Sequence, residues 1–177
     1  MPLKHRGHTL FELLMTLALV GVVFGLGLPA FGGLLADKRL RVETDALFHA
    51  VHVARKASIT RRQVISLCPS TDGVHCAAVD AWSTGWIMFE NDARQAAGTR
   101  EDHEKLLDYH TVDPSVRLRA NRAHFAFRST HLRATNGTIA VCDRAGRARA
   151  RALVVSYTGR PRVAIETPRG QPYSCAD

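Results

Sequence analysis

The stretch from Leu13 to Ala36 contains no charged residue. As an α-helix with a rise of roughly 1.5 Å per residue it would be about 36 Å long, enough to cross the hydrocarbon core of a bilayer. Pro29 lies inside the run and is expected to weaken or kink the helix. Basic residues before the run fit a secretory signal or a plain membrane anchor, but Glu12 at its head fits neither well.

The position of a cleavage site bears on these alternatives. A signal peptide carries small residues for cleavage after its apolar core, and no A-x-A sequence follows this run. The plausible cut lies before it, between Gly7 and His8, and would leave the apolar helix on the mature protein. A carboxylate at the head of a lipid-embedded helix is costly, so Glu12 needs a partner such as the α-amino group of a neighbouring subunit. A simple signal anchor with an unpaired glutamate is the alternative.

The next segment has the pattern of an amphipathic helix. Leu40, Leu47, Val51 and Ala54 recur at helical spacing with charged residues between them. We therefore expect one long helix over residues 9–61. Its first half would lie in lipid, and its second half would pack on a globular domain.

After residue 62 the chain reads as an antiparallel β domain, which gives an α+β fold class. Turn signals such as PSTDG and TNG separate short runs rich in β-branched and aromatic residues. These runs are QVISLC, GWIMFEN, VRLRA, HFAFRS, TIAVC, ALVVSYT and PRVAIE. The polar stretch 93–108 is expected to be a loop with room for one helical turn. The expected organisation is a leader at 1–7, a membrane helix at 8–36, an amphipathic helix at 37–62 and a β domain at 63–177.

The four cysteines are Cys68, Cys76, Cys142 and Cys175. They match no zinc-binding spacing, and His75 is a lone candidate ligand, so no metal is expected. Because an export signal precedes them, disulfides are the better interpretation. Four cysteines allow three pairings. We favour Cys68–Cys76 and Cys142–Cys175, because the first would close a local loop and the second would tie down the C-terminal tail.

Charge is distributed unevenly along the chain, which carries a formal net charge of +8. Residues 72–113 hold three basic and nine acidic side chains, whereas residues 114–177 hold twelve basic side chains, all arginine, and three acidic ones. Arginine suits phosphate because its planar fork donates paired hydrogen bonds. The C-terminal third therefore favours an anionic partner, with a solvated charged surface as the alternative. Nine histidines are scattered without an acid–base–nucleophile set, so neither an enzyme nor a cofactor is expected.

The N-terminal sequence KHRGHTLFELLMTLALVGVVFGLGLPAF resembles a type IV prepilin leader and first helix. The resemblance implies that prepilin peptidase cuts after Gly7 and that His8 becomes the N-methylated first residue. It implies that Glu12 pairs with a neighbour's N-terminal amine during filament assembly, and that Pro29 is the family's helix-breaking proline. The family usually has Phe where this chain has His8.

Later segments resemble the GspH/FimT branch of the pilin-like proteins. They are VISLCPSTDGVHC, WSTGWIMFEN, IAVCDRAG and VVSYTGRPRV. The resemblance implies a long helix laid against a β domain of two small sheets, and other pilin subunits as partners. It also implies a single-pass inner-membrane protein with a periplasmic domain, which then joins an extracellular pilus of a Gram-negative bacterium.

The sequence GRPR contains the G-R-x-R pattern that FimT-like minor pilins use to bind DNA in natural transformation. By that resemblance, Gly159, Arg160 and Arg162 would bind double-stranded DNA without sequence preference. Four further arginines on the preceding turn are expected to extend the patch: Arg144, Arg147, Arg149 and Arg151. Taken alone, the pattern fits a solvated turn equally well.

Three functions stay open on the sequence. The first, which the arginines favour, is a minor pilin that binds DNA for uptake. The second is a pseudopilin of a type II secretion system. The third is a minor pilin that only primes pilus assembly.

Overall fold

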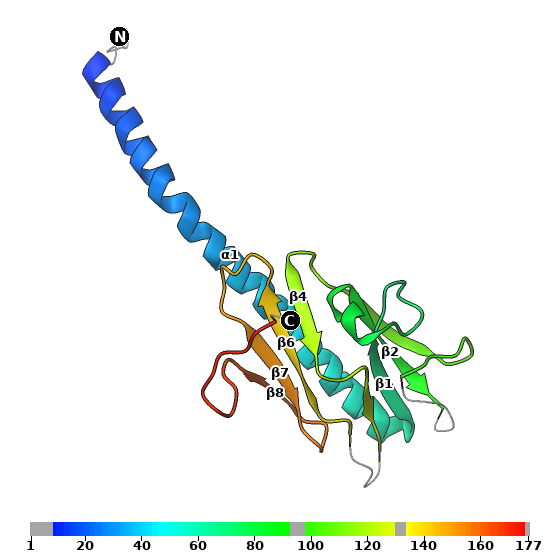
Figure 1. Cartoon of the computed structure of the whole chain (residues 1–177). Coiled ribbons are helices and arrows are strands. Elements are labelled where there is room, and N and C mark those ends of the chain that lie inside the picture. The colour runs from blue at the N-terminus through cyan, green and yellow to red at the C-terminus, as the bar shows by residue number, and fades with distance from the viewer. Residues whose placement is uncertain (1–8, 93–97, 130–133, 176–177) are drawn as a thin grey trace, which may run out of the picture.

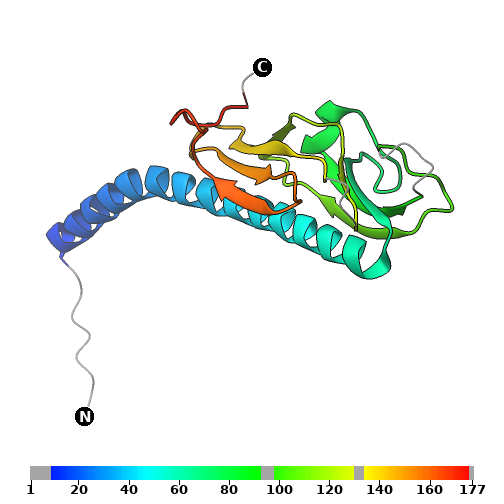
Figure 2. The ribbon, with the colours of Figure 1, turned by 90° about the horizontal axis from the view of Figure 1, so that it is seen from below.

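One long helix organises the molecule, as the sequence predicts (Figure 1). The computed structural model describes residues 9–92, 98–129 and 134–175. Helix α1 runs from Leu10 to Arg61, close to the expected 9–61. It stays helical through the segment with Pro29 and curves gradually (Figure 2). It ends where Arg62 takes a left-handed conformation with φ 53°.

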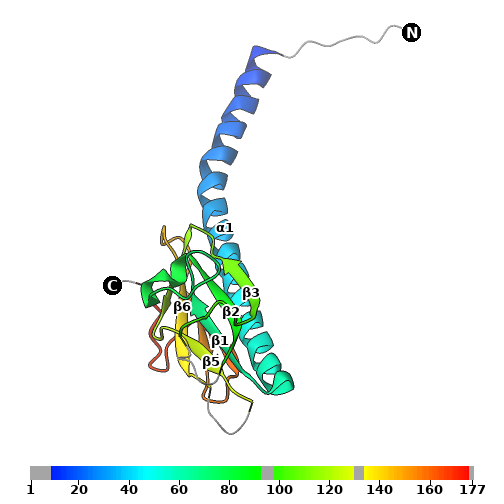
Figure 3. The same cartoon turned by 90° about the vertical axis from the view of Figure 1, so that its right-hand side faces the viewer.

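The two halves of α1 have different surroundings. Apolar side chains from Leu10 to Phe24 are exposed, and this half projects away from the rest of the molecule (Figure 3). One face of the second half is buried from Ala36 onward, with Leu40, Leu47 and Val51 in the core. Over the residues that the structure describes, no helix meets the length and apolarity needed to cross a membrane.

Two antiparallel four-stranded sheets cover the second half of α1, which confirms the α+β fold. The first sheet has the order β3-β2-β1-β5, with β1 Val64–Pro69, β2 Gly85–Asn91, β3 Leu106–Thr111 and β5 Phe125–Phe127. The second has the order β4-β6-β7-β8, with β4 Val116–Ala120, β6 Gly137–Asp143, β7 Arg151–Val155 and β8 Pro161–Ala164. A short 3-10 helix, Val79–Ser83, precedes β2.

Strand β3 differs from the expectation of a loop over 93–108. Residues 93–97 lie outside the described part of the chain, and residues 106–108 begin β3. This strand forms the edge of its sheet, and only Leu107 and His110 are half-buried. An edge strand with polar exposed positions lacks the apolar run that marks a central strand.

The main apolar core joins the helix to both sheets. Trp82 and Trp86 are buried in it, with exposed fractions of 0% and 2%. On the second sheet, Ile139 and Leu153 are cross-strand partners in the core, and Leu153 pairs next with Val163. Because side chains alternate along a strand, neighbouring residues such as Arg162 lie on the outer face.

Candidate nucleic-acid interface and assembly residues

The head of α1 forms a capping box. Thr9 is the N-cap, and its Oγ1 accepts a hydrogen bond from the Glu12 backbone N–H at 3.2 Å. The Glu12 carboxylate in turn accepts one from the Thr9 N–H at 3.4 Å. Glu12 thus sits exposed at the first turn, where a carboxylate also complements the helix dipole. Gly7 and His8 lie outside the described residues.

The β7–β8 hairpin turn carries the G-R-x-R motif, and its glycine is required by the backbone. Gly159 has φ +70°, and its N–H donates to the Ser156 carbonyl at 2.8 Å. The Arg160 N–H donates to the Ser156 hydroxyl at 3.1 Å. A Cβ on Gly159 would stand 3.2 Å from Phe127 and 3.3 Å from Nη1 of Arg55. The turn is therefore tight, buried at Gly159 and seated against α1.

The two arginines of the motif point into solvent. Arg160 and Arg162 are both exposed, and within the described residues neither side chain has an ion pair or hydrogen-bond partner. Arg162 lies opposite Val154 on the outer face of the second sheet. Arg55 adds a third guanidinium beside the turn. Sequence reasoning missed Arg55, because only the fold brings α1 to this hairpin.

The β6–β7 loop, with Arg144 and Arg147, lies too far from the β7–β8 turn to extend the patch as the sequence predicts. The β6–β7 loop and the β7–β8 turn lie at opposite ends of β7, since consecutive hairpins of an antiparallel sheet alternate ends. Arg147 lies 3.3 Å from the position of a Gly32 Cβ, whereas Gly159 lies beside Arg55. At roughly 1.5 Å per residue, those two positions on α1 are about 35 Å apart. Arg147 and Arg144 therefore cannot extend a patch centred on Gly159.

The other two arginines are held by carboxylates. Arg149 pairs with Glu166 at 2.8 Å. Arg151 pairs with Asp37 at 2.9 Å, and its hydrogen bond lowers the pKa of Asp37 below the ordinary value. Arg151 thus ties the second sheet to α1 and has a structural partner for its charge.

Both disulfides have the pairing favoured from the sequence. Cys68–Cys76, the turn disulfide, closes a loop of sequence separation 8. Cys142–Cys175, the tail disulfide, has a separation of 33 and fixes the C-terminal tail on the outer face of the second sheet. Disulfides of this kind are typical of an oxidising compartment.

A buried carboxylate joins α1 to the first sheet. Glu43 is only 4% exposed, and its carboxylate accepts hydrogen bonds from His110 Nε2 at 2.9 Å and from the Asp113 N–H at 3.0 Å. The hydrogen bond to Glu43 raises the pKa of His110 above its ordinary value. The His110 ring also stacks on Trp86 at 5.1 Å. Neither Glu43 nor His110 had a role in the sequence analysis.

His75 stands between two acidic side chains beside the turn disulfide. Its Nδ1 lies 2.8 Å from Asp72 and its Nε2 lies 3.5 Å from Asp102. Hydrogen bonds from the His75 backbone and ring lower the pKa of Asp72. Across the described ranges, no cluster of three or more His, Cys, Asp or Glu side chains could hold a metal ion.

The helix that first projects and then lies on two small antiparallel sheets defines a type IV pilin-like protein. The model of the family described as Type II transport protein GspH matches residues 43–159, and the chain belongs to that family. No curated protein matches the chain at the sequence level.

Several solved structures share the fold, among them a minor pilin and a minor pseudopilin. The type IV minor pilin FimU of Pseudomonas aeruginosa is 19% identical, with a TM-score of 0.54, over 79% of this chain and 97% of that one. The minor pseudopilin EpsH of the Vibrio cholerae type 2 secretion system is 10% identical, with a TM-score of 0.52, over 71% of this chain and 96% of that one. At these identities the likeness concerns the fold and leaves pilus and secretion roles both open.

Proposed function

We propose that the chain is a minor type IV pilin that binds double-stranded DNA without sequence preference during natural transformation. The observation that carries the DNA-binding part is the pair of exposed arginines, Arg160 and Arg162, on the tight β7–β8 turn. Arg55 beside Gly159 adds to the positive charge of the same end. Three guanidinium groups without acidic partners among the described residues suit the phosphates of a DNA backbone.

The filament part of the proposal rests on α1. No described part of the chain covers its exposed apolar half, which would serve first as an inner-membrane anchor and then as the core of a filament of pilin subunits. Prepilin peptidase would cut between Gly7 and His8, and His8 would be N-methylated. Glu12, exposed at the first turn, would exchange its capping contact with Thr9 for the N-terminal amine of a neighbouring subunit.

Residues 36–177 contain every core contact of the described chain, because the buried face of α1 begins at Ala36. This fragment allows DNA binding to be measured in solution by titration with double-stranded DNA at several salt concentrations. The double substitution Arg160→Gln and Arg162→Gln should weaken binding to all sequences. It should also flatten the slope of log K against log salt by about 2, which is roughly one unit for each lost phosphate contact.

The matched control removes the same charge from the other end of the sheet. Arg144→Gln with Arg147→Gln changes the net charge equally but leaves the β7–β8 turn intact. If both double variants lose the same affinity, binding depends on net charge alone and the site assignment is wrong. If neither loses affinity, the DNA-binding proposal is wrong.

The pseudopilin role is the second candidate, because the matching family is described as a type II transport protein. A deletion strain distinguishes the roles through three measurements: transformation frequency, twitching motility and protein secretion. Loss of transformation alone supports DNA binding, and loss of twitching with it supports a role in pilus assembly. Loss of secretion with normal DNA uptake would replace the proposal by the pseudopilin role.

A further inference from the structure

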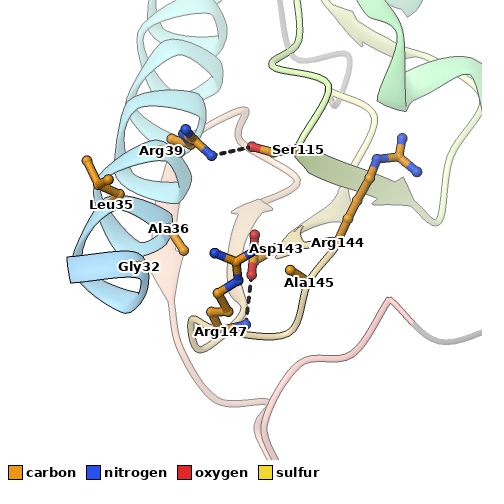
Figure 4. Close-up of a pocket in the computed structure, with 9 residues that line it drawn as sticks. All are labelled: Gly32, Leu35, Ala36, Arg39, Ser115, Asp143, Arg144, Ala145 and Arg147. Carbon is orange, nitrogen blue, oxygen red and sulfur yellow. Dashed lines mark hydrogen bonds between the residues drawn. The ribbon is translucent and has the colours of Figure 1, made fainter. Parts of the chain in front are cut away.

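A small pocket lies where α1 leaves the globular domain, at the end opposite the β7–β8 turn (Figure 4). Its volume is about 150 Å³, and it opens between the helix and the β6–β7 loop. The side chains and backbone that form it include Gly32, Leu35, Arg39, Ser115, Asp143 and Arg147. Nothing in the DNA-binding proposal uses this pocket.

The guanidinium of Arg147 lines the pocket, and among the described residues it has no ion-pair or hydrogen-bond partner. Its backbone N–H donates to Asp143 Oδ2 at 2.7 Å, which fixes the loop. Its guanidinium lies against α1, with Nη1 3.3 Å from the position of a Gly32 Cβ. A Cβ at position 32 would therefore touch the end of the Arg147 side chain, which would have to shift by a few tenths of an ångström.

Arg39 supplies a second guanidinium from the helix. Its Nη1 donates to the Ser115 hydroxyl at 3.3 Å, and its Nε lies 3.9 Å from Asp113, while half of the side chain is exposed. Arg144 instead turns away from Arg147 in Figure 4 and donates Nε–H to the Val116 carbonyl at 3.2 Å. Two arginines from different elements therefore face the pocket.

Basic side chains outnumber carboxylates around this end of the domain. The basic residues that line the pocket or pair with its neighbours are Arg39, Arg41, Arg144, Arg147 and Arg151, and the carboxylates are Asp37, Asp113 and Asp143. Asp37 is shared between two arginines, and Asp143 is occupied by the loop backbone. The surplus of positive charge is thus available to an anion from outside.

The height of the pocket on α1 matches the surface of a bilayer. Gly32 lies 22 residues after Leu10, which is about 33 Å of helix and close to the roughly 30 Å thickness of a hydrocarbon core. Phe31, Leu34 and Leu35 are exposed beside it, with fractions of 63%, 54% and 55%. Apolar side chains on one side and arginines on the other are the arrangement expected at the boundary between acyl chains and headgroups.

We propose that this pocket binds the phosphate of an anionic phospholipid headgroup while the apolar half of α1 is in the membrane. The proposal rests on the proposed membrane anchoring and is independent of DNA binding. Paired guanidinium groups donate to phosphate oxygens in a fixed geometry, and basic residues beside a membrane helix are attracted by anionic lipid. The bound headgroup would fix the tilt of the domain on the membrane before the subunit enters a filament.

The test uses the full chain, one copy per lipid nanodisc, in discs of phosphatidylglycerol or of phosphatidylcholine. Hydrogen–deuterium exchange is followed at the amides of Gly146 and Arg147, which bond only within their own loop. Exchange should be roughly tenfold slower in the phosphatidylglycerol discs, and the difference should shrink at high salt. A third arm adds inorganic phosphate to phosphatidylcholine discs. Equal protection there would identify a free-anion site and overturn the lipid assignment.

Three variants locate the effect. Arg39→Gln with Arg147→Gln should abolish the difference between the two lipids. Gly32→Leu, which fills the pocket and keeps every charge, should abolish it as well. The charge-matched Arg160→Gln with Arg162→Gln should retain it, and loss there would show that net charge alone is responsible.

The two underlying proposals fail in different ways. A chain that does not co-purify with either type of disc refutes membrane anchoring, and the lipid site with it. A chain that co-purifies with both and shows equal exchange in both lipids refutes the lipid site alone. DNA affinity of residues 36–177 is unaffected by either result.

Discussion

The contact between Glu43 and His110 makes the stability of the domain depend on pH. The pKa of His110 is raised by its hydrogen bond to Glu43, so the folded state holds a proton that the unfolded chain releases near pH 6.5. The resulting stabilisation is complete below about pH 6.5 and is lost as pH rises through the raised pKa. His124 acts in the opposite direction, because burial lowers its pKa and stability is lost as pH falls below about 6.5. We therefore expect maximum stability near pH 6.5.

The structure sets the size of the effect when Glu43 is changed. Glu43→Ala removes two hydrogen bonds to a buried carboxylate and leaves the Asp113 N–H without its acceptor. This should lower the free energy of unfolding by about 3 kcal/mol at pH 6, a large share of the roughly 5–15 kcal/mol typical of a domain. Glu43→Gln keeps an acceptor for the Asp113 N–H, so it should cost only about 1 kcal/mol.

Urea denaturation of residues 36–177 between pH 5 and 8.5, with the disulfides intact, measures both effects. Trp86 provides the fluorescence signal because it stacks on His110. Glu43→Gln should reduce the decline above pH 6.5 and leave the decline below it. The part that remains above pH 6.5 comes from His75, whose pKa is raised by its hydrogen bond to Asp72. His124→Gln should do the reverse. If the glutamine variant at position 43 declines above pH 6.5 as steeply as the unmodified protein, His110 is not the group responsible.

Four further variants test local features of the fold. Replacing both cysteines of the tail disulfide with serine should cost about 3.7 kcal/mol, against about 2.5 kcal/mol for the turn disulfide, because the longer loop restricts the unfolded chain more; equal midpoints in urea would contradict this. Gly159→Ala places a side chain at φ +70° against Phe127. We therefore expect the free energy of unfolding to fall by about 1 kcal/mol and DNA binding to weaken. If stability and DNA affinity are both unchanged, the turn tolerates a side chain at this position. Gly85→Ala would put a Cβ 2.5 Å from the His110 carbonyl oxygen. We therefore expect the free energy of unfolding to fall by about 2 kcal/mol or more in thermal unfolding. An unchanged midpoint would mean that β2 and β3 can move apart at this point without loss of stability.

The features that the sequence predicts are local ones. The limits of α1 follow from an unbroken apolar run, then a helical spacing of Leu40 and Leu47, and the structure confirms them. Most strands follow from short apolar runs between turn signals. Strand β3 was missed, because its pairing partner β2 and the buried Glu43, rather than its own composition, hold it in place.

The arginine patch shows why proximity in sequence misleads in an antiparallel sheet. Arg147 and Arg160 are separated by one strand, and that strand carries them to opposite ends. Arg55, more than a hundred residues before the motif, lies beside it instead. No pattern within either segment predicts that contact, which depends on how α1 crosses the second sheet.

The arginines gather at two opposite ends of the domain. This separation bears on how one chain could bind a membrane at one end and DNA at the other. Arg39 lies about 24 Å of helix from Arg55, and Gly32, beside Arg147, lies about 35 Å from it. If Arg39 and Arg147 face anionic lipid, the β7–β8 turn points away from the bilayer. A DNA duplex carries one negative charge per roughly 1.7 Å and is repelled by an anionic membrane surface. At several Debye lengths, which are about 8 Å each at physiological salt, that repulsion is screened, so the distal turn could bind DNA before or after assembly. If Arg160 and Arg162 lay on the β6–β7 loop beside Arg147, DNA and anionic lipid would compete for one site.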